Sequence, residues 1–443
     1  MQVSVETPGG LERRLKVQVP AERVDEAVEA RVKRAGKHAK VPGFRPGKAP
    51  MKVLIQRYGD QARQEAVSDI IQSTYGEALQ QSELKPAGQP NIEVGQLPLP
   101  GQALEYTAVF DVYPEIAIKG LDKLKVEQPE TEITDADVDK TLDSFREQHK
   151  RFDAVERPAQ EGDEVNINFE GKLDGEAFEG GKGEDFDVVL GAGRLLETME
   201  KGIVGHAPGE TFEVDVDFPE DYPSEDLKGK TAQFTVTLNK VAEAVLPELD
   251  DEFAKTVGVA EGGIDALREK VREGLAREKE KAVKNSVKQQ IMDELLKANE
   301  VECPRGLVAQ EMDNMRREAA QRLPEQMRQD AEKIRQLMPD EIFKEGAERR
   351  VALGLLIAEV IRDRNIELDD ARVDAVIADL SQGYEKTEEV ATYYRSNPQI
   401  MQGIQAMAME EQVVDSLLET ARVKTVAMGY EELMQSQQQG SQA

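Results

Sequence analysis

The chain has 443 residues and a formal net charge of -30; a third of its residues are charged, 5% are aromatic and none is Trp. This length predicts two to four domains, and the composition favours a helix-rich protein with extended charged surfaces over a compact enzyme. The one cysteine, Cys303, excludes an intramolecular disulfide, no apolar run is long enough to span a membrane, and the lack of a basic and apolar leader predicts a cytosolic location.

The first 112 residues mix apolar alternation with helical periodicity. Alternation typical of strands occurs at 1–20, 91–95 and 103–112. Helices are predicted at about 21–38, where Val24, Val28 and Val32 form one stripe, and at about 50–83, with an interruption near Gly59. We therefore expect an α+β domain over residues 1–112, with two helices on a small antiparallel sheet.

A stiff loop, KVPGFRPGKAP at 40–50, separates these two helices, and its prolines exclude a helix there. The surrounding window from 31 to 57 has no Asp or Glu and contains nine cations: Arg31, Lys33, Arg34, Lys37, Lys40, Arg45, Lys48, Lys52 and Arg57. One interpretation is a solvated basic helix face followed by a turn. The other is docking to a polyanion, in which phosphates bind the cations while Phe44 and Arg45 stack on unpaired bases or enter a protein pocket.

Residues 113 to about 130 are punctuated by proline and predict an extended linker. Thr134 then caps a predicted helix in which Val138, Leu142 and Phe145 share one face. From 162 to 241 the pattern changes to short alternating strands separated by glycine turns, at 164–169, 186–190, 211–217 and 233–238. This segment predicts an independent β-rich domain.

Beyond Pro247 nearly every segment has helical periodicity. Helices are predicted at about 263–300, 305–322, 340–364, 369–383, 388–396 and 398–422, and the low-complexity end MQSQQQGSQA is predicted to be disordered. Ten of the 13 methionines lie between Met292 and Met434. They either fill irregular gaps in helical cores or form a surface that accepts many apolar shapes.

Common catalytic constellations are missing from the sequence. His38, His149 and His206 lack the spacing of zinc ligands, and Cys303 is interpreted as structural because Pro304 follows it at a helix boundary. The GAG at 191–193 lacks the third glycine of a dinucleotide fingerprint, and no phosphate-binding loop occurs. We therefore expect no cofactor and no metal.

The β-rich segment contains FEGKLDGEAFEGG, DFDVVLGAGRLLETMEKGIVG and FPEDYPSEDLKGKTAQFTVTL. In order and spacing these stretches resemble the FKBP-type peptidyl-prolyl isomerases over about 80 residues. The resemblance implies a curved antiparallel sheet wrapped on one short helix, with an apolar pocket between them. It assigns the pocket to Phe169, Phe178, Glu179, Phe186, Leu195, Leu196, Met199, Tyr222 and Phe234. The alternative is that these aromatic side chains are simply core, above all Phe234.

The chemistry of X-Pro isomerisation suits such a pocket. The barrier of about 18–20 kcal/mol arises from amide resonance, whose charge separation water supports. A dry aromatic pocket therefore favours the twisted, less polar transition state without a nucleophile or metal. One departure from the family is Met199, preceded by Glu197 and Thr198, where a large aromatic preceded by Pro-Gly is common. This departure predicts weak isomerase activity.

The three parts in this order resemble the trigger factor family of ribosome-associated bacterial chaperones over essentially the whole chain. In that family a GFR-x-GK loop docks on the large ribosomal subunit beside the exit tunnel, on ribosomal protein and rRNA. The resemblance assigns that role to Gly43, Phe44, Arg45, Pro46, Gly47 and Lys48. Pro46 departs from a common lysine, which costs one cation and stiffens the tip. Nascent and unfolded polypeptides are the implied clients, no membrane partner is implied, and a homodimer off the ribosome is left open.

We therefore expect a multidomain α+β protein whose central sheet is FKBP-like and whose C-terminal, substrate-binding domain is elongated and all-α. The expected parts are a ribosome-binding domain at 1–112, a linker and helix at 113–149, the isomerase domain at 150–245, a helical chaperone domain at 246–432 and a disordered tail at 433–443. The predicted function is ATP-independent holding of nascent chains combined with X-Pro isomerisation. The alternatives are a free-standing isomerase with oligomerising flanks, and an RNA-binding protein, which the acidic bulk of the chain disfavours.

Overall fold

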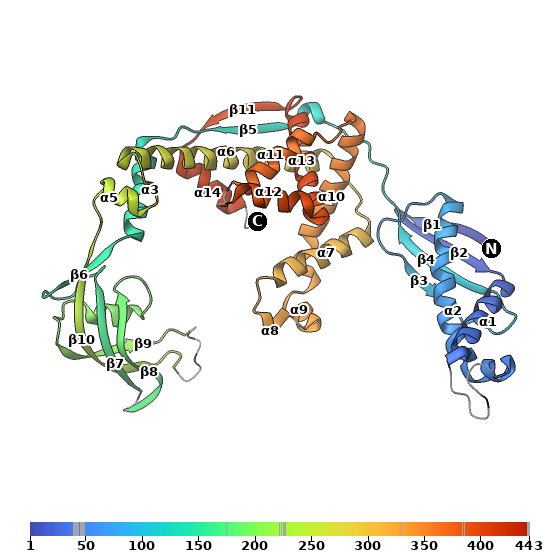
Figure 1. Ribbon diagram of the computed structural model, residues 1–443, viewed down its shortest axis with the longest axis horizontal. Coiled ribbons are helices and arrows are strands. Elements are labelled where there is room, and N and C mark those ends of the chain that lie inside the picture. Colours follow the sequence, from blue (N-terminus) through green and yellow to red (C-terminus); the bar gives the residue numbers. More distant parts are fainter. Residues whose placement is uncertain are drawn as a thin grey trace. The chain divides into compact units, whose positions relative to one another are not determined.

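The structure is a computed structural model and describes residues 1–38, 44, 49–173, 175–220, 222, 224, 227–328, 330–382, 384 and 386–440 (Figure 1). Two compact units can be distinguished. The first consists of Met1–Gln128 and Asn285–Val426, and the second of Pro129–Lys284 and Ala427–Ala443. Each unit is therefore assembled from segments that lie far apart in the sequence.

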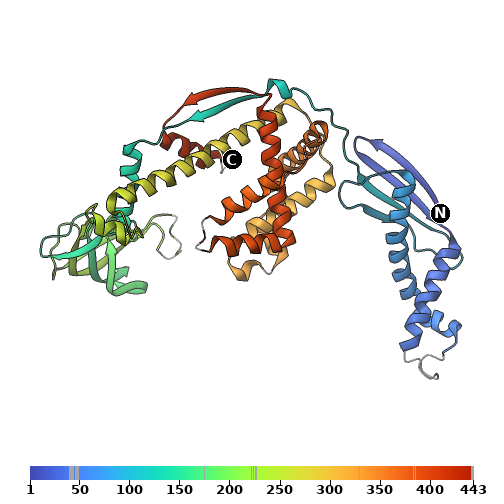
Figure 2. The same ribbon diagram turned by 45° about the horizontal axis from the view of Figure 1, so that its top comes forward.

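The N-terminal domain is an α+β layer structure, as the sequence predicts. Its sheet has the order β1-β2-β4-β3, formed by β1 (Gln2–Gly9), β2 (Glu12–Val19), β4 (Leu104–Asp111) and β3 (Asn91–Val94). The helices α1 (Ala21–His38) and α2 (Met51–Ser82) pack on one face of this sheet (Figures 1 and 2). Alternate residues of β2, Leu15, Val17 and Val19, are buried against the predicted α1 stripe of Val24, Val28 and Val32.

The predicted interruption of the second helix at Gly59 is wrong, because α2 is continuous from Met51 to Ser82. A single glycine inside a helix costs only about 1 kcal/mol relative to alanine. Leu54 before Gly59 and Ala62, Ala66 and Val67 after it are all buried in the same core. Packing on both sides of the glycine outweighs its low helix propensity.

The segment after β4 is extended, as predicted, and amide side chains of a distant helix hold it. It contains a short 3-10 turn, η1 (Leu121–Lys123), and the strand β5 (Lys125–Glu130). On α6 (Gly263–Ala298), Gln290 both accepts from the backbone N–H of Glu127 and donates to its carbonyl, each at 2.8 Å. Asn299, just beyond α6, does the same for Lys119, at 2.8 and 3.3 Å.

β5 also pairs with a strand that the sequence analysis missed, β11 (Arg422–Ala427). A helix was predicted to continue to residue 422, whereas α13 (Pro398–Leu418) ends four residues earlier. The short β-rich stretch RVKTVA forms its strand with a partner almost 300 residues away in the sequence. Periodicity within one segment does not reveal such a partner.

The helical part of the first unit agrees closely with the predicted segments. It contains α7 (Arg305–Ala320), α10 (Asp340–Arg364), α11 (Asp370–Ser381), α12 (Thr387–Ser396) and α13. Two short helices, α8 (Glu325–Arg328) and α9 (Ala331–Leu337), were not predicted. Asp111, at the end of β4, accepts from the backbone N–H of Arg305 at 2.6 Å, so a carboxylate satisfies the amino end of α7.

The second unit contains the predicted β-rich domain. Its strands are β6 (Arg151–Val155), β7 (Glu164–Leu173), β8 (Glu176–Val189), β9 (Thr211–Asp217) and β10 (Thr231–Val245). They form one antiparallel sheet in the order β6-β10-β7-β8, with β9 also paired to β10, and the short helix α4 (Glu197–Ile203) packs against it. The fold that the resemblance implied for this domain is therefore present.

The rest of the second unit is a small helical core. Thr134 begins α3 (Asp135–Gln148) with a capping box to Asp137, and Val138 and Leu142 are fully buried, as predicted. They pack with α5 (Asp251–Thr256) and with the first part of α6.

The prediction of a disordered tail at 433–443 is wrong for most of this segment, because residues up to Gly440 belong to the helix α14 (Tyr430–Gly440). The last three residues, 441–443, lie outside the described part. Leu433 is fully buried, and the Tyr430 hydroxyl donates to Glu278 of α6 at 2.6 Å. A low-complexity sequence thus becomes helical where one apolar residue and one aromatic residue anchor it on a core.

No helix among the described residues is both long and apolar enough to cross a membrane.

Replacing Asn299 with alanine is expected to loosen the linker from α6. The Asn299 side chain is buried, and its loss leaves both peptide groups around Lys119 without their partner, which costs about 1–3 kcal/mol locally. Hydrogen exchange of the amides at 117–121 should accelerate by about tenfold or more. Asn314→Ala, on α7, is the matched control and should leave these amides unchanged.

Candidate functional site

The β-rich domain brings most of the predicted pocket residues together as one aromatic cluster. The ring of Phe169 lies 6.0 Å from Phe186 and 6.1 Å from Phe234, and the ring of Phe178 lies 5.9 Å from Phe234. Phe178 is also 6.3 Å from Phe218, whose ring lies 4.8 Å from Tyr222. Most of these contacts are edge-to-face, the geometry that aromatic quadrupoles prefer.

Three glycines make room for the rings. A Cβ atom on Gly183 would lie 2.6 Å from the ring of Phe169, which is its cross-strand neighbour in the β7–β8 pair. A Cβ on Gly171 would meet its neighbour Phe234 at the same distance, and one on Gly181 would lie 2.9 Å from Phe178. The rings of Phe169 and Phe234 thus occupy the space of a missing side chain on the facing strand, whereas Gly181 makes room for Phe178 within β8 itself.

The cluster has a buried floor and a half-buried wall. Met199 and Phe234 are 4% and 5% exposed, whereas Phe169, Phe178, Phe186 and Tyr222 are half-buried. Leu195 and Leu196 are half-buried in the turn that leads into α4. A partly exposed apolar surface with a buried methionine in its core is an environment that can hold a proline ring.

Three contributors were missed by the sequence analysis. Phe218 is a buried member of the cluster, and its place in the quoted stretch FPEDY was the available signal. Glu200 of α4 is buried and accepts from the backbone N–H of Gly191 at 3.1 Å and of Leu195 at 3.5 Å, which holds the turn that carries both leucines. The guanidinium of Arg194 lies 5.7 Å above the ring of Phe186. Periodicity gives no indication of the last two contacts.

The predicted Glu179 carboxylate lies outside the described side chains, although its backbone belongs to β8. Its role stays a prediction. The remaining eight predicted residues are all members of the one apolar cluster described above.

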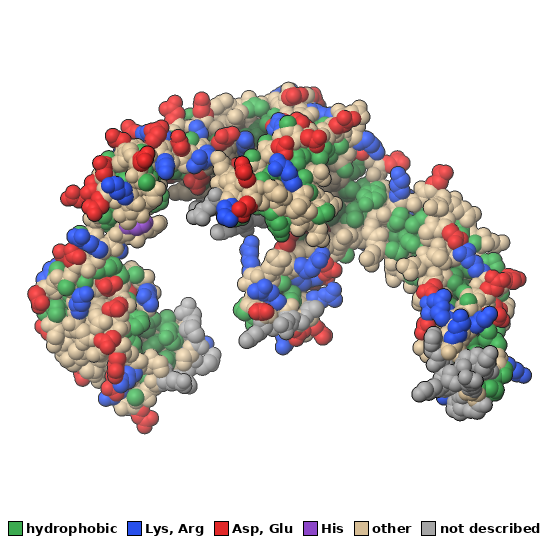
Figure 3. All heavy atoms as spheres, in the orientation of Figure 1, with side chains coloured by type: hydrophobic (Ala, Val, Ile, Leu, Met, Phe, Trp, Pro, Cys, Tyr) green, Lys and Arg blue, Asp and Glu red, His purple; other side chains and the backbone are tan. Residues whose placement is uncertain are grey.

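The predicted docking loop lies almost wholly outside the described residues, which exclude Gly43, Arg45, Pro46, Gly47 and Lys48. Phe44 is described and is 41% exposed. Lys and Arg side chains gather on the N-terminal domain toward the end where α1 ends and α2 begins (Figure 3).

One of the nine counted cations is compensated, because Arg31 bonds Glu65 at 2.5 Å and also Asp69, both on α2. The acids that neutralise it lie outside the window from 31 to 57, so a count within the window overstates its charge. Lys33, Arg34, Lys37 and Lys52 are exposed, and no ion pair joins them to any residue that the structure describes. They retain their charge for a partner.

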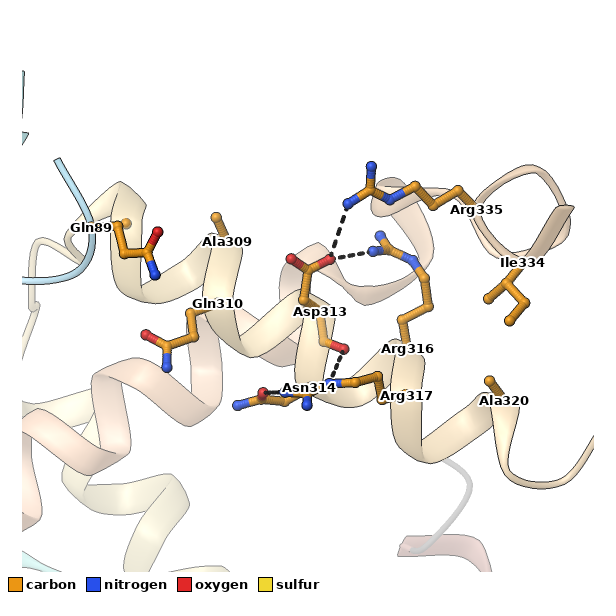
Figure 4. A pocket seen from close by; sticks show the side chains of 11 residues that line it. Gln89, Ala309, Gln310, Asp313, Asn314, Arg316, Arg317, Ala320, Ile334 and Arg335 are labelled. Atoms are coloured by element: carbon orange, nitrogen blue, oxygen red, sulfur yellow. Dashed lines mark hydrogen bonds and ion pairs between the residues drawn. The ribbon is translucent and has the colours of Figure 1, made fainter. Parts of the chain in front are cut away.

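A groove of about 580 Å³ lies along α7 in the first unit (Figure 4). Three guanidiniums line it, but they are used internally: Arg316 donates to Asp313 at 2.6 Å, to the carbonyl of Met338 and to Asp340, and Arg335 lies 3.9 Å from Asp313. Arg317 donates to Asn314. The bonds of Arg316 to Met338 and Asp340 attach α7 to the start of α10, so this side of the groove is a joint between two helices.

The histidines and the cysteine are structural where they are described. His206 stacks on Phe212 with ring centroids 3.6 Å apart and contacts Glu210 at 2.8 Å, which lowers the pKa of that carboxyl. His149 meets Phe253 edge-on, and burial raises the pKa of the Cys303 thiol. Within the described ranges, no three His, Cys, Asp or Glu side chains form a group that could hold a metal ion.

Comparisons with known proteins agree with this geometry. Family models described as bacterial trigger factor protein, FKBP-type peptidyl-prolyl cis-trans isomerase and bacterial trigger factor protein C-terminus match residues 1–145, 155–239 and 263–419. A trigger factor of Thioalkalivibrio sulfidiphilus (strain HL-EbGR7) is 47% identical, with 100% of both chains covered. One of Shewanella woodyi (strain ATCC 51908 / MS32) is 45% identical, covering 99% of this chain and 100% of the relative.

A solved structure described as "Promiscuous Substrate Recognition in Folding and Assembly Activities of the Trigger Factor Chaperone" is 19% identical and has a TM-score of 0.48, covering 95% of this chain and 99% of that chain.

Gly183→Ala should damage the aromatic cluster selectively. The new methyl group requires the Phe169 ring to move, and a displacement of this size in a catalytic pocket can lower a rate by up to about 100-fold. We expect kcat/KM for cis-trans isomerisation of a proline peptide to fall by about tenfold or more. Gly274→Ala, in α6 with open space around it, is the control and should keep full activity; equal rates for the two variants would contradict the assignment.

Proposed function

The chain belongs to the trigger factor family, and on that premise we propose how its described residues share the work of a chaperone with a ribosome-binding N-terminal domain and an FKBP-type peptidyl-prolyl isomerase domain. The proposal is based on the aromatic cluster, whose rings pack over glycines, and on the exposed cations where α1 ends and α2 begins in the same chain. The first supports isomerisation and the second supports docking on RNA.

Isomerisation requires an environment in which the twisted amide is more stable than in water. The planar X-Pro amide carries charge separation that water supports, whereas the twisted amide carries less. We propose that the proline ring enters against Phe169, Phe186 and the floor formed by Met199 and Phe234, with Phe178, Tyr222, Leu195 and Leu196 as the wall. The family resemblance also assigns Glu179 to this pocket.

This environment acts by shape and by excluding water, and each 1.36 kcal/mol by which it lowers the barrier accelerates the reaction about tenfold. Met199 presents a flexible side chain at the floor, which holds a proline ring less rigidly than a large aromatic would. We therefore keep the prediction of weak isomerase activity.

Docking is assigned to the end of the N-terminal domain. The exposed ring of Phe44 and the uncompensated charges of Lys33, Arg34, Lys37 and Lys52 support contact with rRNA and ribosomal protein beside the exit tunnel. Gly43, Arg45, Pro46, Gly47 and Lys48 would complete the tip. The chain as a whole carries a net charge of -30, so its remaining surface repels RNA, which confines binding to this end and disfavours general RNA binding.

Holding of clients is assigned to exposed apolar side chains of the helical part. One group follows α7 and consists of Met327, Leu337 and Ile342, which are 47%, 56% and 65% exposed. A second group lies on α11, α12 and their connection and consists of Leu380, Tyr384 and Tyr393, which are 39%, 55% and 58% exposed. Such side chains bind unfolded polypeptides reversibly, without nucleotide. The cytoplasm as the site of action and a homodimer off the ribosome stay predictions.

Replacing Phe44, Arg45 and Pro46 together with alanine is expected to abolish co-sedimentation with bacterial ribosomes. The charge variant Lys33→Glu, Arg34→Glu and Lys37→Glu should weaken binding and reduce its dependence on salt, because fewer phosphate contacts release fewer counterions.

The matched control for these variants is Lys281→Glu with Lys284→Glu on α6, which changes charge away from the N-terminal domain and should bind like the unmodified protein. Equal pelleting of the alanine variant and the unmodified protein would disconnect the loop from the ribosome. Strong binding of naked RNA, at the same salt and lost in the same variants, would favour the RNA-binding alternative.

Replacing Leu380, Tyr384 and Tyr393 with serine should weaken the suppression of client aggregation by about tenfold or more, since each side chain contributes roughly 1.5 kcal/mol or more when a client buries it. Isomerase activity on a short peptide should stay unchanged, whereas Gly183→Ala should show the opposite pattern. Serine at the equally exposed Tyr113 and Val423 is the control. A free-standing isomerase would lose both activities with Gly183→Ala and neither with the serine variant.

A further inference from the structure

An apolar groove of about 490 Å³ lies in the N-terminal domain. It is bounded by α2 on one side and by the strand β3 on the other, and its lining is Ser68, Ile71, Gln72, Tyr75, Pro90, Ile92 and Val94. None of these side chains is charged. We call this the β3 groove.

The β3 groove contains a polar atom that lacks a partner. The hydroxyl of Tyr75 is buried and has no hydrogen bond to any residue that the structure describes, and burial together with the nearby Tyr106 raises the pKa of Tyr75 to about 12. The neighbouring phenol of Tyr106 is satisfied, because its hydroxyl lies 2.9 Å from Thr74 Oγ1. A buried hydroxyl without a partner is rare in folded proteins and indicates that something else supplies the bond.

The strand beside the groove is an open edge. In the order β1-β2-β4-β3, the strand β3 pairs with β4 on one side, through Asn91 to Val94, and has no other strand beside it in the described part. Alternate N–H and C=O groups of its outer side therefore point away from the sheet. Ile92 and Val94 share the face that lines the groove, whereas Glu93 points to the opposite face, so no charge on the groove side blocks the pairing of another strand.

We propose that the β3 groove binds an extended, uncharged and apolar segment of an unfolded polypeptide, which adds to β3 as a further strand. The open edge supplies backbone hydrogen bonds, and the groove accepts alternate apolar side chains of the segment. On binding, the Tyr75 ring turns toward the groove, so that its hydroxyl, which is buried in the unbound protein, bonds a polar group of the segment. This inference rests on the proposed chaperone function and adds a client site to the domain that docks on the ribosome.

Two features favour this occupant over a second copy of the chain. The groove has a volume of only about 490 Å³, whereas a stable interface between folded proteins buries about 1,200 Å² or more. A second copy would also bring another net charge of -30 to an uncharged surface, and like charges oppose that association. An extended segment of neutral residues meets neither obstacle.

The test uses the full chain and a fluorescent, uncharged eight-residue peptide in which valine alternates with serine or threonine. Saturable binding is expected, together with slower hydrogen exchange of the amides of Asn91 to Val94. A second peptide has the same side chains but carries N-methyl groups on alternate residues, which removes the backbone N–H donors along one side of the extended peptide. If the peptide pairs with β3 through these donors, the methylated peptide should bind at least tenfold more weakly.

Two pairs of variants locate the site. Val94→Lys places a charge in the groove and should weaken binding at least tenfold, whereas Leu99→Lys adds the same charge on the more exposed residue beyond it and should not. Tyr75→Phe keeps the ring and removes the unpartnered hydroxyl, so it should weaken binding by roughly three- to tenfold. Tyr106→Phe removes a satisfied hydroxyl and should leave peptide binding intact.

Absence of saturable binding at millimolar peptide overturns the inference, and so does equal binding by Val94→Lys and Leu99→Lys. A dimer in sedimentation velocity that Val94→Lys abolishes and Leu99→Lys preserves would instead assign the groove to a second copy. The suppression of client aggregation is measured in parallel. If the full chain suppresses aggregation while the groove variants bind the peptide as well as the unmodified chain does, the proposed client site is wrong and the chaperone function stands. If the unmodified chain suppresses no aggregation, the proposed function itself fails.

Discussion

The architecture depends on two amide side chains, Asn299 and Gln290, which attach the extended segment after β4 to α6 by hydrogen-bonding the peptide groups of Lys119 and Glu127. After the N-terminal sheet the chain runs along α6 and then continues to the β-rich domain. This segment precedes α6 in the sequence by more than 100 residues. A side-chain amide matches both the N–H and the C=O of a peptide group, so it holds an extended segment wherever no strand is available. The first unit can therefore contain both the N-terminal domain and most of the helical part.

On this framework the protein keeps apolar surface exposed while remaining highly charged. Leu337, Ile342 and Tyr393 are more than half exposed, and the β3 groove and the partly buried rings of the aromatic cluster add apolar surface. Apolar patches of this kind promote aggregation in most proteins. A net charge of -30 opposes association between copies. High charge thus offsets the exposed apolar surface that a chaperone needs for nascent chains.

Much of the fold follows from local pattern, and the candidate site was predicted from the family resemblance. Most long helices agree with the 3.6-residue periodicity, and eight of the nine predicted pocket residues belong to one cluster. Contributors that depend on distant partners were missed: Glu200 contributes through the backbone of Gly191 and Leu195, and β11 exists because β5 pairs with it. Arg31 loses its free charge to Glu65 and Asp69, which lie on another helix. A local pattern contains no information about these neighbours.

By itself the sequence determined most of the succession of elements and the acidic composition with its basic island, because both depend on residue types and spacing along the chain. The residues of the aromatic pocket were predicted only through the resemblance to the FKBP-type isomerases. Tertiary structure alone decided which glycine lies under which ring, how α14 is anchored by Leu433, and that Tyr75 lacks the partner that Tyr106 has. Two tyrosines on adjacent elements look alike in a sequence. They differ only in whether a hydroxyl from a neighbouring helix turn reaches them, and that distance is fixed by packing.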